Sequence, residues 1–194
     1  MVTTAVGVLA VMCGLARAWP QVARIVVRRD TQGVSALTWM LSLCAFISWE
    51  AIGMVEHITA AVVFNSLAIV SAAAALAVLV WQHALAWWCP LVAALTAIAA
   101  SIVAYKTLGA LGTSVLGVGI SVSMFIPQAL KVLRVPSSGV SVATWWLAVV
   151  TAVFWTLYGV MLGKLVLIVP NVVMMPVAGI ILWQSGRTLT TESE

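Results

Sequence analysis

Long apolar stretches alternate with short polar segments along most of this chain. Each stretch is about 20 residues long, which is the length that an α-helix needs to cross a bilayer. The pattern predicts an all-α integral membrane protein. Seven transmembrane helices are expected, at about residues 3–27, 34–55, 58–81, 84–105, 109–134, 141–162 and 164–184.

Two parts of the chain carry the same scarce residues at matching positions. Residues 33–39 (GVSALTW) align with residues 139–145 (GVSVATW), and each segment follows a Pro-Gln dipeptide and a basic stretch. Matching Val or Leu would mean little in so apolar a chain, whereas Pro, Gln, Trp and Asn are rare enough for the match to indicate an internal duplication.

The duplication predicts the domain organisation. Residues 1–82 form the first three-helix repeat, 83–106 a linker helix, 107–186 the second three-helix repeat, and 187–194 a cytoplasmic tail. Three helices end on the opposite side of the membrane from where they begin, so a second copy in the same orientation requires one extra crossing. The expected arrangement is therefore two parallel three-helix bundles joined by the linker helix (3+1+3).

Composition and charge support this picture and set the orientation. The chain is 64% hydrophobic and 7% charged, with a mean hydropathy of +1.18, so the lipid bilayer is its expected surroundings. Basic residues concentrate on cytoplasmic loops. Placing Arg24–Arg29 and Lys131–Arg134 there puts the N-terminus outside and the C-terminus in the cytoplasm of a multi-pass cell (plasma or inner) membrane protein. The net charge of +4 is thus a topology signal, and nucleic acid is not an expected partner.

No chemistry of an enzyme is visible in the sequence. Cys13, Cys44 and Cys89 lie inside apolar runs and show no ligand spacing with His57 or His83, so neither a metal site nor a cofactor is expected. The sequence also lacks a nucleophile elbow, a phosphate loop and paired carboxylates.

The best candidates for substrate binding are polar and aromatic residues at equal depth in both repeats. Asn65 and Asn171 are predicted near the bilayer midplane, where a polar side chain is costly unless it serves a function. Trp49 and Trp155 each precede the Asn by sixteen residues. Amides bond hydroxyls and aromatic rings stack on apolar faces, although an Asn pair can also simply hold helices together. The Trp residues near helix ends are instead expected in interfacial belts: Trp39, Trp87, Trp88, Trp145, Trp146 and Trp183.

Two prolines are expected to bend membrane helices at equivalent positions. Pro20 and Pro127 each remove one backbone hydrogen bond, and Gln21 and Gln128 follow them directly. A static kink is one interpretation, and the pairing favours a hinge or gate.

These residues together resemble the PQ-loop superfamily, and more closely the SWEET and SemiSWEET sugar transporters. The resemblance rests on the Pro-Gln dipeptides and on the spacing from Trp to Asn, and it covers nearly the whole chain. It implies that Trp49, Asn65, Trp155 and Asn171 line a central pocket, and that a small sugar moves down its gradient by alternating access, as in a uniporter. Plant SWEETs have further prolines in the second and sixth helices, which this chain lacks.

Glu50 has no acidic counterpart in the second repeat, where Thr156 takes its place. Arg17 is the candidate partner of Glu50 by depth, and a proton carrier is the other interpretation. Two alternatives to the sugar transporter therefore stay open. One is a proton-coupled exporter of amino acids or other small solutes, and the other is a receptor that binds without transporting. The sequence leaves the substrate, the direction of flux and a homo-oligomeric state undetermined.

Overall fold

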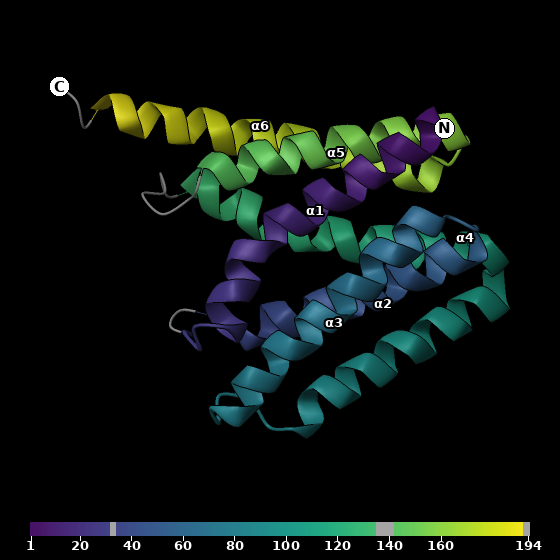
Figure 1. Cartoon of the computed structure of the whole chain (residues 1–194), viewed down its shortest axis with the longest axis horizontal. Helices are drawn as coiled ribbons and strands as arrows, with labels where there is room; N and C mark the ends of the chain where they lie inside the picture. The colour runs from purple at the N-terminus through teal and green to yellow at the C-terminus, as the bar shows by residue number, and fades with distance from the viewer. Residues whose placement is uncertain (32–33, 135–141, 192–194) are drawn as a thin grey trace. The chain divides into compact units, whose positions relative to one another are not determined.

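The computed structural model describes residues 1–31, 34–134 and 142–191, and it describes side chains outside 123–134, 142–144 and 184–191. Over these ranges the fold is entirely helical (Figure 1), and six helices are each long and apolar enough to cross a membrane. Their bounds are α1 Val2–Val26, α2 Ala36–Val55, α3 Thr59–Trp81, α4 Trp88–Arg134, α5 Val142–Leu162 and α6 Leu165–Thr191.

The prediction of seven separate helices is not confirmed, because α4 spans both the fourth and the fifth predicted helix. It contains one non-helical residue, Gly109, with φ 60° and ψ −143°. Figure 1 shows the ribbon of α4 turning sharply part of the way along its length. A single residue makes the break, so no loop separates the two parts.

Glycine is required twice at this turn. Gly109 lies in the left-handed region of φ, which residues with a Cβ atom avoid. A Cβ atom at Gly112 would lie 2.1 Å from the carbonyl oxygen of Ala104. The two parts of α4 therefore approach each other more closely than any larger residue at position 112 would allow.

Contacts between residues divide the chain into two compact units, each described here by itself. Unit 1 comprises Met1–Arg17 and Val118–Glu194, and unit 2 comprises Ala18–Gly117. In unit 2 the helix α2 packs on α3, and in unit 1 the helix α5 packs on α6. These are the equivalent hairpins of the two predicted repeats.

The two hairpins bury equivalent positions. The core of unit 2 joins Trp39 of α2 to Ala72 and Ala75 of α3, and the core of unit 1 joins Trp145 of α5 to Ala178 of α6. Trp39 and Trp145 are each only 9% exposed. The expectation that these two residues lie in an interfacial belt was therefore wrong.

The remaining tryptophans assigned to the belt are exposed, as a lipid-facing position requires. Their exposed fractions are 53% or more, and they are Trp87, Trp88, Trp146 and Trp183.

Both hairpins turn in the same way. His57 and Gly163 have φ of 56° and 66° at equivalent positions, and in each turn the next residue donates its backbone N–H over 2.8 Å to the carbonyl of Gly53 or Gly159. These two glycines are close to the opposite helix: a Cβ atom at Gly53 would lie 3.0 Å from the backbone nitrogen of Val62. The repeat seen in the sequence is therefore also a repeat in backbone geometry.

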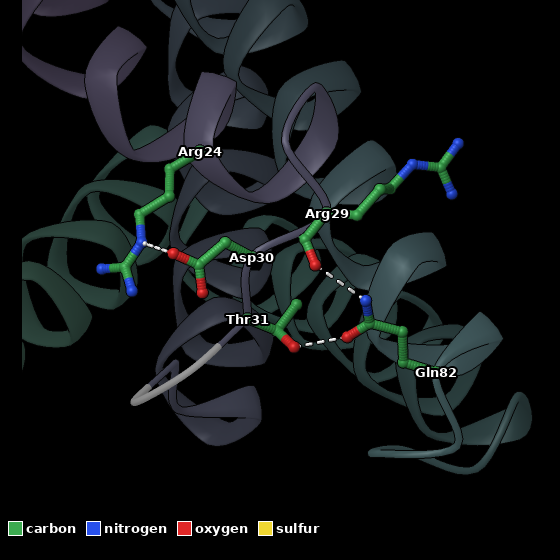
Figure 2. A network of polar contacts seen from close by, with 5 residues as sticks. All are labelled: Arg24, Arg29, Asp30, Thr31 and Gln82. Atoms are coloured by element: carbon green, nitrogen blue, oxygen red, sulfur yellow. Dashed lines mark hydrogen bonds and ion pairs between the residues drawn. The ribbon is translucent and has the colours of Figure 1, made fainter.

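Polar contacts attach the loop after α1 to the C-terminal end of α3 within unit 2 (Figure 2). The Gln82 side chain donates to the carbonyl of Arg29 over 2.9 Å and accepts from the hydroxyl of Thr31. Arg24 forms an ion pair with Asp30, with 2.7 Å between Nε and Oδ2. The C-terminal part of α1 is thus held to the α2–α3 hairpin.

Candidate functional site

Asn65 and Asn171 adopt the same local geometry in their separate units. Each side-chain amide donates over 2.7 Å to a carbonyl four residues earlier in its own helix, that of Ala61 or Leu167. Asn65 is buried and Asn171 is half-buried. One N–H of each amide is used in this bond, and an Asn side chain carries a second N–H and an acceptor oxygen besides.

The spacing from Trp to Asn has a simple structural origin. Trp49 and Asn65 each lie eight residues from the turn residue His57, and Trp155 and Asn171 each lie eight residues from Gly163. At the helical rise this is about 12 Å from the turn along both helices of a hairpin. The structure therefore places the Trp and Asn of each copy at one level of their own hairpin.

The two tryptophans differ in their surroundings. Trp155 is buried and packs edge to face on Tyr158, with 6.1 Å between ring centroids. Trp49 is half-buried. The position equivalent to Tyr158 is Ile52, so the first copy has no aromatic residue at that position.

Glu50 is fixed to the neighbouring helix by one oxygen. The hydroxyl of Ser66 donates to its Oε1 over 2.8 Å, whereas its Oε2 is buried without a hydrogen-bond partner among the described residues. Arg17 and Glu50 belong to different units, so the structure does not test the predicted pair.

The predicted hinge residues are described only in part. Pro20 lies inside α1, where it and Gln21 are exposed. Position 127 lies within α4, and the side chains of Pro127 and Gln128 fall outside the described residues. The hinge therefore remains a prediction.

Sequence reasoning missed two further prolines. Pro170 and Pro176 lie inside α6, and the equivalent residues of α3 are Phe64 and Val70. Pro170 directly precedes Asn171 and removes one backbone bond of the helix at that level. The position of Pro170 inside an apolar run of the sequence already indicated a proline within a membrane helix.

Groups of three or more His, Cys, Asp or Glu residues that suit a metal ion are absent from the part of the chain that the structure describes. The side chains that the sequence sets apart are amides, aromatic rings, prolines and the predicted charged pair Arg17 and Glu50. Polar and aromatic side chains of these kinds are typical of small-molecule pockets.

The chain has the fold of a known membrane transporter. It is similar over 98% of its length to the whole of a solved chain described as a eukaryotic SWEET transporter, with a TM-score of 0.74 and 15% sequence identity. No family model matches the sequence, and no curated protein matches it. The helices and this neighbour together define a multi-pass membrane protein with the SWEET fold.

Proposed function

We propose that this protein is a facilitative transporter of small sugars, mono- or disaccharides, that works by alternating access. The observation that carries the proposal is the SWEET fold over nearly the whole chain, together with a Trp and an Asn at one level of each equivalent hairpin. The proposed substrate-binding residues are Trp49, Asn65, Trp155 and Asn171.

The chemistry of these residues suits a neutral polyhydroxylated molecule. The bond from each Asn to its own helix fixes the orientation of the amide, so the amide need not lose rotational freedom when a ligand binds. The remaining N–H and the oxygen can then bond sugar hydroxyls, while an indole ring stacks on the apolar face of the sugar.

The proposed topology has seven membrane crossings. The break at Gly109 divides α4 into two parts, and we assign one crossing to each part. The first part then corresponds to the predicted linker helix of residues 83–106, between repeats at 1–82 and 107–186. The N-terminus lies outside, and the tail of residues 187–194 lies in the cytoplasm with most of the basic residues.

A proton-coupled carrier of amino acids or other small solutes is the second candidate, and Glu50 favours it. One oxygen of its carboxyl group is buried without a hydrogen-bond partner among the described residues, and an ionisable residue inside a membrane segment is a candidate for carrying protons. A cycle of protonation and release at Glu50 would couple solute movement to a pH gradient.

Flux into proteoliposomes tests both candidates. The purified protein is reconstituted, and uptake of a panel of labelled sugars and amino acids is measured with and without an imposed pH gradient. The facilitator predicts saturable sugar uptake that stops at equal concentrations and does not respond to the gradient. Uptake of amino acids alone, or sugar uptake that accumulates with the gradient, would refute it.

A further inference from the structure

Two buried oxygen atoms without partners lie at equivalent positions of the two repeats. Among the side chains that the structure describes, the buried polar atoms lacking a hydrogen-bond partner are Oε2 of Glu50 and Oγ1 of Thr156. The offset that aligns Trp49 with Trp155 also aligns Glu50 with Thr156. Each atom therefore belongs to the residue that directly follows a proposed substrate-binding Trp, although the two side chains, a carboxyl group and a hydroxyl group, differ in chemistry.

A buried polar atom without a partner is costly, at about 1–3 kcal/mol each, and therefore calls for an explanation. Thr156 makes this point most clearly, because a hydroxyl in a helix has a partner close at hand in the carbonyl three or four residues earlier. Hydroxyls elsewhere in this chain use that partner, namely those of Ser42, Ser48, Ser71, Ser101, Thr107 and Thr151. Thr156 does not.

Glu50 also has an unpartnered oxygen, but its other oxygen accepts a hydrogen bond. Ser66, which directly follows Asn65, donates to Oε1 and so fixes the carboxyl group at the level of the proposed binding residues. The residue equivalent to Ser66 is Val172, whose side chain has no hydrogen-bond donor. In each hairpin one oxygen thus stays unpartnered next to the Trp.

We propose that Oε2 of Glu50 and Oγ1 of Thr156 are two further substrate-binding atoms, and that the substrate presents a hydrogen-bond donor to Glu50. A carboxylate accepts such bonds strongly, from a sugar hydroxyl or from the ammonium group of an amino sugar. Thr156 accepts or donates. The inference rests on the proposed sugar transport and adds one further binding atom to the proposed residues of each hairpin.

The first test uses Thr156→Val, which keeps the side-chain shape and removes the hydroxyl. Thermal unfolding in detergent without sugar should occur at the same or a higher temperature, because a buried unpartnered group is removed. Affinity for the sugar with the fastest flux in the panel should fall roughly tenfold to a hundredfold. The matched control is Thr113→Val, whose buried hydroxyl donates to the carbonyl of Ala110 over 2.9 Å. It should unfold at the same or a lower temperature and keep its sugar affinity.

The second test uses Glu50→Gln with the same sugar, its monodeoxy derivatives and its amino derivatives. The variant should bind the parent sugar roughly tenfold to a hundredfold more weakly than the wild type does. For one deoxy derivative the two proteins should bind equally, because that derivative lacks the donor facing Glu50. An amino group can then be placed at the position where that deoxy derivative lacks its hydroxyl. If the amino derivative binds the wild type more tightly than the parent sugar does, and the variant does not share this gain, the donor is an ammonium group. If the wild type prefers the hydroxyl, the substrate is a neutral sugar.

Several results would overturn the inference. Unchanged sugar affinity in both variants, or an equal loss for every derivative, would show that these oxygens do not contact the substrate. If Glu50→Gln removed a pH-gradient response while sugar affinity stayed the same, Glu50 would be a proton carrier instead. If the wild-type protein binds no sugar in the panel, the proposed function itself is refuted. If the wild type binds sugar and the variants bind it equally well, only the role of the two oxygens is refuted.

Discussion

Replacing Gly159 by Ala tests whether the close approach of α5 and α6 holds the proposed site in place. The new Cβ atom would lie 2.9 Å from the side chains of both Leu167 and Ile168, and 3.2 Å from the carbonyl oxygen of Lys164. Overpacking of this kind costs about 1–3 kcal/mol. Ala in place of Gly in a helix contributes about 1 kcal/mol in the opposite direction, so the net loss of stability is roughly 0–2 kcal/mol.

A second glycine serves as a control that separates the cost of overpacking from the gain in helix propensity. Gly179 lies inside α6, and apart from its own stretch of helix no described residue has an atom within 4 Å of a Cβ built there. Gly179→Ala should therefore stabilise the protein by about 1 kcal/mol, the helix term alone. The difference between the two variants should be about 1–3 kcal/mol, because the helix term cancels. Equilibrium unfolding in detergent micelles measures both free energies.

Gly159→Ala should also weaken substrate binding. The carbonyl of Leu167 accepts the bond that orients Asn171, so a shift of Leu167 away from the new methyl group moves the amide with it. Gly159→Ala should bind sugar less tightly than Gly179→Ala. The reasoning fails if Gly159→Ala is at least as stable as Gly179→Ala, since the hairpin would then have room for a methyl group.

Three further predictions concern topology and the proposed site. Cysteine introduced at Arg187 should be labelled only from the cytoplasm and cysteine at Lys164 only from outside, and the opposite pattern would refute the orientation. Asn65→Ala and Asn171→Ala should each lower sugar affinity roughly tenfold to a hundredfold while the protein still folds; undiminished transport in the double variant would reduce the pair to a helix contact. Trp155→Ala should reduce sugar affinity more than Trp155→Phe does, because Phe keeps a stacking face, and equal losses in a binding titration would argue against stacking.

Most helix positions could be predicted because the membrane sets the length of each apolar run. The predicted helix at 34–55 is observed as Ala36–Val55, and that at 58–81 as Thr59–Trp81. The last helix continues to Thr191, past its predicted end at residue 184. Hydropathy marks where the apolar run stops, whereas the backbone remains helical through the polar residues that follow.

Other features depend on which way a side chain faces, and hydropathy does not contain that information. Trp39 and Trp145 lie near helix ends, as a belt requires, but they point into the hairpin cores. The paired Asn residues could be found from their rarity and spacing. Their bonds to Ala61 and Leu167, and the unpartnered oxygen of Glu50, required coordinates.

Comparison of the two repeats separates what maintains the fold from what is specific to one copy. The turn and the amide bonded to its own helix recur in both hairpins and so belong to the repeated unit itself. Some of the features that differ lie at the level of the proposed binding residues: Glu50 and Ser66 in the first copy, Thr156 and Val172 in the second, with Pro170 beside them. Next to the proposed binding residues, the two hairpins therefore differ in the groups that they would offer to a substrate.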